Sequence, residues 1–368
     1  MSQIKPQIEN SYESSIKKLK EVLEEGYKKI EPYLHAYTNK AESVKPVAKH
    51  VTIYWVGRAE DRMILRTEGE DDIILSKVKG EAVPTIIFRK LKAVYLRDFM
   101  QLLRRQWELY KDDIRELYKD DIKKDIDDSN YDLLTSCSLS PGLAGEGKGT
   151  MHGRCMKCPA DILMGATSAT VNYNLASRFV GDSAYALTSS YERRTGNAVD
   201  EITYTTIMLR EGQTQEEWRT GALFAETFVE PGTLFVGKIV LFMPSPVELL
   251  YVLWLLTRTI RVGARTSIWG TLKITPVALL ADLYEVGSSY EASESLFGET
   301  KEEEARRKLL GYVKGVSYAT GTDVIEVTSD TLSKLRSMNM LDSKLVKELW
   351  VNTKNYISAV REYITVKK

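Results

Sequence analysis

The stretch of sequence that decides the fold is EPGTLFVGKIVLFMPSPVELLYVLWLL, residues 230–256. Residues 233–242 are rich in β-branched and aromatic side chains and follow the turn-forming triplet Glu-Pro-Gly, which predicts a long strand. Pro246 then opens a helix, because proline suits the first helical turn. The apolar run at 249–256 is far shorter than the roughly 20 residues of a membrane span, so we expect a buried helix and no membrane contact.

Helices and strands alternate in the part of the chain before this stretch. Apolar residues between Ile16 and Leu34 recur every three or four positions, which predicts an amphipathic helix interrupted near Pro32. Similar steps predict a long helix over residues 91–127. Between these helices, a period of two and charged turns predict short strands at 51–56, 62–67, 73–78 and 83–88.

The remaining segments complete a mixed pattern. Strands are predicted at 203–209 and 222–228, a glycine-punctuated segment covers 263–270, and the last third of the chain is helical. Residues 138–153 contain five glycines and no periodicity, which is typical of a long functional loop. Since no low-complexity linker divides the chain, we expect one α+β core with large insertions.

Composition narrows the class of protein. The chain has 368 residues, and its 51 Lys and Arg balance its 51 Asp and Glu. This zero net charge excludes a uniformly basic nucleic-acid binder and an acidic disordered tail, but it permits a local basic groove. Three cysteines leave no complete disulfide set, and residues 1–10 lack an apolar signal region, so we expect a reducing, cytoplasmic setting.

A cysteine–histidine cluster predicts a metal site. Cys137, His152, Cys155 and Cys158 have the spacing C-x14-H-x2-C-x2-C. A C-x2-C pair places two thiolates on one turn, and Cys3His is a closed, four-coordinate zinc set. The interpretation is therefore a structural zinc ion that stabilises an inserted loop. Two alternatives stay open: reduced cysteines without a ligand in a core turn, and a redox-active C-x-x-C pair.

A basic stretch without acids suggests contact with phosphate. Residues 249–281 contain no Asp or Glu but carry Arg258, Arg261, Arg265 and Lys273. The three arginines step by three and four, so they would line one face if the helix from Pro246 continued. Guanidinium groups bind phosphate bidentately and stay charged. The alternative is that these arginines pair with acids elsewhere in the chain or only aid solubility.

Further basic residues precede and follow this stretch. Arg89 and Lys90 open a second basic group, which Lys92, Arg97, Arg104 and Arg105 extend, and Arg66 closes a predicted strand. A third group surrounds Lys148. No nucleophile elbow, Walker loop or dinucleotide fingerprint is present, so the sequence predicts no enzyme.

Four pieces of the chain, in this order, resemble one protein family. They are the segment LRTEG at 65–69, the segment RCMKCP at 154–159 with the residues up to Ser168, the segment NLASRF at 174–179 running to Leu187, and residues 230–266 from EPGTLF to RVGART. Together they resemble the crRNA-binding backbone subunit of type I-D CRISPR–Cas effector complexes, over roughly residues 50–270.

The resemblance implies a fold and a set of partners. The fold would be an RRM-like (ferredoxin-like) antiparallel sheet core with large insertions, including a zinc-binding loop domain. The partners would be crRNA or other single-stranded RNA, other CRISPR effector subunits, and further copies of the chain associated head-to-tail in antiviral defence. Segments would be 1–45 (N-terminal helical), 46–130 (first half of the core with a long helix), 131–200 (zinc-binding insertion), 201–290 (second half of the core with the glycine-rich loop) and 291–368 (C-terminal helical).

The resemblance also assigns sites. The zinc ligands would be Cys137, His152, Cys155 and Cys158, and the RNA-binding residues would be Arg66, Arg89, Lys90, Lys148, Arg178, Arg258, Arg261 and Arg265. Ser267, Ile268 and Trp269 stand where family members often have a second arginine, which weakens the expected RNA contact of that loop. Two other functions remain as alternatives: a metal-dependent nuclease that acts on RNA or a target strand, and a zinc-stabilised protein–protein adaptor.

Overall fold

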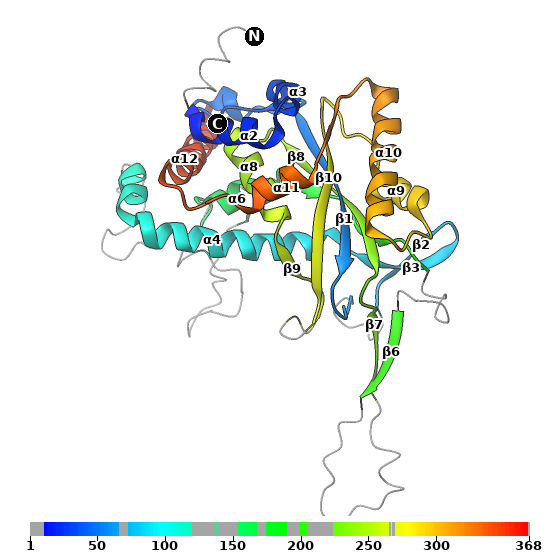
Figure 1. Cartoon of the computed structure of the whole chain (residues 1–368). Coiled ribbons are helices and arrows are strands. Elements are labelled where there is room, and N and C mark those ends of the chain that lie inside the picture. Colours follow the sequence, from blue (N-terminus) through cyan, green and yellow to red (C-terminus); the bar gives the residue numbers. More distant parts are fainter. Residues whose placement is uncertain are drawn as a thin grey trace, which may run out of the picture.

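The computed structural model shows a mixed α+β fold in which one large antiparallel sheet has helices on both faces (Figure 1). The structure describes residues 11–65, 73–119, 137, 154–167, 174–189, 199–204, 224–264, 266 and 269–366. Within these ranges, the helices are either too short or too polar to cross a membrane.

Three long strands form the centre of the sheet: β1 (His50–Ala59), β8 (Leu234–Phe242) and β10 (Thr271–Asp282). The strand order is β11-β10-β1-β8-β5-β3-β2. In addition, β4 pairs with β8, and β9 pairs with β10. The shorter strands are β2 (Leu75–Val78), β3 (Glu81–Ile86), β4 (Phe179–Gly181), β5 (Ala184–Ala186), β9 (Thr259–Arg261) and β11 (Val324–Glu326). A separate two-stranded ribbon, β6 (Val199–Tyr204) with β7 (Phe224–Val229), extends below the main sheet in Figure 1.

The two faces of the sheet have different cores. Along β1, the side chains of Val51, Ile53 and Trp55 pack into the larger core with helices α4 (Phe88–Leu117) and α8 (Pro246–Leu256). Tyr54 and Val56 pack on the other face with α9 (Ser289–Leu296) and α10 (Glu302–Thr320). The helices are α2 (Glu13–Leu23), α3 (Gly26–Ile30), α4 (Phe88–Leu117), α6 (Pro159–Met164), α8 (Pro246–Leu256), α9 (Ser289–Leu296), α10 (Glu302–Thr320), α11 (Ser329–Arg336) and α12 (Ser343–Val366), with short 3-10 turns at Glu31–Tyr33 and Ala41–Val44.

The structure confirms the strand and the helix predicted within residues 230–256, and it corrects two of the strands predicted earlier in the chain. The predicted strand and helix are β8 and α8, and Ser245 and Glu248 form a capping box that starts the helix. The predicted strand at 62–67 is wrong in its described part, because Met63 and Ile64 form only single bridges, to Val229 and Ala264. The predicted strand at 83–88 ends at Ile86, and Phe88 already begins α4.

A tryptophan and a glycine allow the two central strands to pair closely. Trp55 lies directly opposite Gly237 in the β1–β8 register, and it is fully buried. A Cβ atom on Gly237 would lie only 2.1 Å from Cζ2 of the indole ring. The absence of a side chain at Gly237 is therefore what makes room for the indole within the core.

We expect Gly237→Ala to lower the free energy of unfolding by about 1–3 kcal/mol, because the added methyl group overpacks the core beneath Trp55. Chemical denaturation monitored by circular dichroism measures the change. The control is Gly311→Ala in α10, where a Cβ meets nothing within 4 Å, so that variant should be more stable by about 1 kcal/mol. Equal effects of the two substitutions would contradict this role for Gly237.

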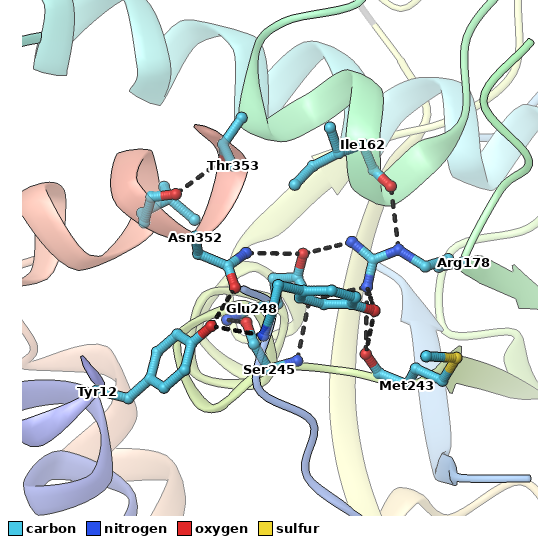
Figure 2. A network of polar contacts seen from close by, with 10 residues as sticks. Tyr12, Ile162, Arg178, Met243, Ser245, Glu248, Asn352 and Thr353 are labelled. Carbon is cyan, nitrogen blue, oxygen red and sulfur yellow. Dashed lines mark hydrogen bonds and ion pairs between the residues drawn. The ribbon is translucent and has the colours of Figure 1, made fainter. Parts of the chain in front are cut away.

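A buried ion pair connects segments that are far apart in the sequence (Figure 2). Arg178, which directly precedes β4, donates to Glu248 of α8 through Nη1 at 2.9 Å and through Nη2 at 2.5 Å. Nη1 also lies within hydrogen-bond distance of the Tyr37 hydroxyl and the Met243 carbonyl oxygen, and Nε donates to the Ile162 carbonyl oxygen. Although burial opposes ionisation of Glu248, the adjacent guanidinium outweighs it and holds the pKa of this carboxyl below its usual value.

The same network includes both terminal regions. Asn352 of α12 donates to Glu248 at 3.2 Å and accepts from the Tyr12 hydroxyl at 2.6 Å. The Arg178 guanidinium also lies over the rings of Tyr37 and Tyr356. The N-terminal segment, the insertion, α8 and α12 thus meet at one charge pair.

Removal of one partner should be costly, since it leaves an uncompensated charge in the interior. We expect Glu248→Gln, which keeps the size of the side chain, to destabilise the fold by about 3–5 kcal/mol. The control is Glu304→Gln, which breaks an exposed pair with Arg307 and should change stability by less than about 1 kcal/mol. Thermal and chemical unfolding of the two variants test this, and similar small effects in both would refute it.

Candidate functional site

Three cysteines and one aspartate form a compact group. The side-chain ligand atoms of Cys137, Cys155, Cys158 and Asp161 all lie within 4.8 Å of one another. The sulfur atoms of Cys137 and Cys158 are 4.0 Å apart. A tetrahedron with zinc–sulfur bonds of 2.3 Å separates its ligands by about 3.8 Å, so this group has the dimensions needed to hold a metal ion.

The local sequence explains how the C-x2-C turn forms. Met156 adopts a left-handed conformation (φ 58°), which turns the chain between the two cysteines. The backbone N–H of Lys157 then points at the Cys155 sulfur, 3.4 Å away. Pro159 begins α6 directly after Cys158, and this helix carries Asp161 in its first turn.

Asp161 is the most constrained member of the group. It is fully buried, its Oδ1 accepts from Arg154 Nε at 2.7 Å, and its Oδ2 accepts from the Met156 backbone N–H at 2.7 Å. Burial, reinforced by the neighbouring Cys137, raises its pKa to about 6, although Arg154 acts in the opposite direction. Both carboxylate oxygens are therefore engaged in organising the turn.

The thiols differ in acidity. Hydrogen bonds from Cys155 and Cys158 lower the pKa of Cys137, whereas burial raises the pKa of Cys155 and Cys158. Three adjacent thiolates in a buried site would repel one another without a cation. The chemistry of this donor set fits a metal ion that binds with release of protons.

The structure brings together three of the four predicted ligands. Cys137, Cys155 and Cys158 meet, and His152 lies outside the described residues. Sequence reasoning missed Asp161, because the search for ligands considered only cysteine and histidine. An acidic residue three positions after a C-x2-C pair, in the first turn of a proline-started helix, was the available signal.

The predicted basic residues occupy different environments. Arg258 and Arg261 are exposed, Arg89 is exposed at the start of α4, and Lys90 beside it is partly buried. Arg178 is a correction: it is buried with side-chain exposure of 8% and all its contacts are internal, so it is unavailable to RNA. Arg66, Lys148 and Arg265 lie outside the described residues.

The arginines of the acid-free stretch do not share a helix face, so that expectation was wrong. Helix α8 ends at Leu256, Arg258 follows it in a turn, and Arg261 belongs to β9. Threonine and β-branched residues between 257 and 262 favour the extended backbone there. Two arginines nevertheless remain exposed on this connection, and Arg258 lies 5.0 Å from the centre of the Trp254 ring.

The glycine-rich loop is held by residues that sequence reasoning did not single out. Asp61 accepts from the backbone N–H groups of Gly270 and Thr271 at 2.8 and 2.7 Å. Gly263 has a φ of 109°, and a Cβ there would lie 2.4 Å from the Ile64 carbonyl oxygen. Beside this loop, Arg62 stacks over Phe228 at the end of the ribbon, 4.6 Å from the ring centre.

Comparison with known proteins agrees with this architecture. A crystal structure of Thermofilum pendens Csc2 matches with a TM-score of 0.63 and 22% identity, over 92% of this chain and 95% of that chain, which shows a shared fold. Two chains from structures described as a CRISPR RNA-guided surveillance complex, one of them pre-nicking, match less closely. Their TM-scores are 0.47 and 0.45 at 11% identity, over 75% and 78% of this chain and 89% and 92% of theirs.

Two further comparisons concern the protein family to which the chain belongs. No curated protein matches the chain. The family model described as Csc2 Crispr, however, matches residues 33–356, which include the complete main sheet, the cysteine group and most of α12. On this evidence, the chain belongs to the Csc2 family of CRISPR proteins.

Proposed function

We propose that this protein is a non-catalytic subunit of a type I-D CRISPR effector complex that binds the guide RNA through a basic surface. The observation that carries the proposal is the exposed arginine pair Arg258 and Arg261, within a 33-residue stretch free of acids, in a chain of the Csc2 family. Arginine binds phosphate bidentately, so such a surface suits RNA without a need for a basic protein.

The distribution of charge supports this surface. Arg97 is exposed on α4, a helix that packs against β9. Among the described residues, neither Arg97 nor Arg258 has a carboxylate within ion-pair distance, whereas Arg58, Arg105 and Arg307 elsewhere are paired with acids. Exposed guanidinium groups without an ion-pair partner attract a polyanion even when the protein as a whole is neutral.

The sheet topology supports an RRM-like core for the proposed subunit. When the intervening elements β2, β3, α6, β4, β6, β7 and β9 are set aside, β1, α4, β5, β8, α8 and β10 have β-α-β-β-α-β order. In the sheet, the first of these strands, β1, lies between the last, β10, and the third, β8. An ordinary RRM stacks bases on its open sheet face. Here Tyr54 on that face is fully buried and donates to the Val286 carbonyl, so we assign RNA contact to the loops and the α8–β9 connection instead.

We expect Arg258→Ala combined with Arg261→Ala to weaken binding of single-stranded RNA by roughly tenfold at about 100 mM salt. The slope of log K against log salt should fall by about 1.4, since each lost phosphate contact contributes about 0.7. Fluorescence anisotropy with labelled RNA at several salt concentrations measures both quantities.

The control for that experiment removes the same charge elsewhere: Arg307→Ala with Lys314→Ala, both exposed on α10. This control should leave affinity and salt slope nearly unchanged. The proposed surface would be contradicted if the Arg258 and Arg261 double variant bound RNA as tightly as the wild-type protein, or if the affinity did not depend on the salt concentration.

We also propose that the cysteine group holds a structural zinc ion with Cys137, His152, Cys155 and Cys158 as ligands. Both oxygens of Asp161 already accept hydrogen bonds, so this residue would orient the turn from outside the ligand shell. Within the insertion, the ion would connect Cys137 to the turn that leads into α6, whose Ile162 carbonyl accepts from Arg178.

Elemental analysis of protein purified without chelator should find about one zinc ion per chain. Cys155→Ser and His152→Ala should reduce this to well under half, and His50→Ala, a histidine on β1, should not. Asp161→Asn should retain zinc but bind it 10–100-fold more weakly. If Asp161→Asn loses the metal and His152→Ala keeps it, the proposed fourth ligand is wrong.

Head-to-tail self-association along the guide belongs to the same proposal. A heterologous interface that does not close generates a filament, and an RNA of finite length would limit its growth.

A further inference from the structure

Two aromatic rings and one arginine lie together at the end of β7 that leads into the main sheet. The Arg62 guanidinium lies over the Phe228 ring, 4.6 Å from its centre, and the Trp269 ring lies 6.4 Å from the Phe228 ring between centres, with planes at 38°. Phe228 is buried, whereas Arg62 and Trp269 are partly exposed. We call these three residues the Trp269 cluster. A buried ring therefore supports both an indole and a cation at the surface.

Backbone hydrogen bonds fix the position of the Trp269 cluster. Gly270, which follows Trp269, donates to the Arg62 carbonyl at 2.8 Å, and its own carbonyl accepts from the Val262 N–H at 2.8 Å. The φ of Gly270 is 93°, and a Cβ there would lie 2.3 Å from the Val262 carbonyl oxygen, so only glycine suits this close approach. The chain beside the indole is thus ordered before any ligand binds, which reduces the entropy cost of binding.

The Trp269 cluster adjoins the proposed RNA surface. Arg261 of β9 is exposed and lies opposite Thr271 of β10, two residues after Trp269. Arg62 forms no ion pair with any carboxylate that the structure describes. Sites for single-stranded nucleic acid combine positive groups that follow the phosphates with aromatic rings that stack on the bases. The cluster adds such a ring next to the arginines of the proposed surface.

We propose that Trp269 stacks on a nucleobase of the bound guide, while Arg62 and Arg261 contact the neighbouring phosphates. Every base has a π-face, so this contact does not depend on which base is present. A subunit that recurs along one guide needs this independence, because successive copies meet different bases. The inference rests on the proposed RNA-binding function and adds a non-ionic contact to it.

We expect Trp269→Ala to weaken the binding of oligo(U) and of oligo(A) by roughly tenfold each, as measured by fluorescence anisotropy. The slope of log K against log salt should stay at its wild-type value, since the loss of stacking changes no phosphate contact. Trp269→Phe keeps an aromatic ring and should bind within about threefold of the wild-type protein. The control is Tyr318→Ala, which removes a ring that is 90% exposed on α10 and should leave the affinity unchanged.

Abasic RNA separates stacking from a general effect on the fold. An oligonucleotide of the same length that keeps its ribose and phosphate groups but lacks its bases offers no ring to the indole. The wild-type protein and Trp269→Ala should therefore bind abasic RNA equally tightly. If Trp269→Ala weakens the binding of abasic RNA as much as that of oligo(U), the substitution acts through the fold and the stacking contact is overturned.

Photocrosslinking tests the contact in the wild-type protein, so the result does not depend on the folding of a variant. Oligonucleotides that carry 5-iodouridine are irradiated in the complex, and the protein is then digested with trypsin. Mass spectrometry should find the label on the peptide 266–273, which contains Trp269 as its one aromatic residue.

The possible failures are distinguishable. An unlabelled peptide 266–273, or wild-type affinity of Trp269→Ala for both oligonucleotides, would overturn the stacking contact and leave the RNA-binding surface intact. A loss of affinity for only one of the two oligonucleotides would also overturn it, because the contact would then select a base. Absence of binding of the wild-type protein to every RNA would overturn the proposed function together with the contact.

Discussion

The buried pair of Arg178 and Glu248 is the interaction on which the arrangement of this molecule depends. A charge in the interior is tolerated only when its partner and all its hydrogen bonds are present. Arg178 meets this condition with contacts from the chain before β1, from α6 and from α8. Glu248 adds Asn352 of α12. These segments must therefore dock together, which fixes the cysteine group and the end of α8 relative to the sheet.

Arginine serves three different purposes in this chain, and the nearest acid decides which one. Arg178 meets Glu248 in the core and stabilises the fold. Arg154 meets Asp161, where it supports the cysteine turn. Arg258 lies over an indole ring and forms no ion pair with a described carboxylate, and its side chain is exposed. A chain with zero net charge can thus present a basic surface, because the carboxylates that balance the charge lie elsewhere.

The two faces of the sheet explain why RNA binding would use the edges of the core. Helices α9 and α10 cover the face that carries Tyr54 and Val56, and α4 and α8 cover the face that carries Trp55. Neither face is open to bases. Among the described residues near the ends of these strands, Arg258 and Arg261 between α8 and the end of β9, and Arg97 of α4, are exposed.

The sequence by itself determined the strongest local elements. Residues 233–256 specify a buried strand and helix, since their period, their turn and Pro246 all agree, and three cysteines within 22 residues specify a common site. It also identified the acid-free arginines. The tertiary structure alone decided that Arg178 is internal and that Asp161 joins the cysteines. It also decided that Met63 and Ile64 bridge to Val229 and Ala264 instead of forming a strand. The physical reason is the distance along the chain over which each interaction acts. Periodicity and turn chemistry depend on residues that are neighbours in the sequence. The partner of a buried charge or of a buried backbone group comes instead from a distant segment that only folding brings close.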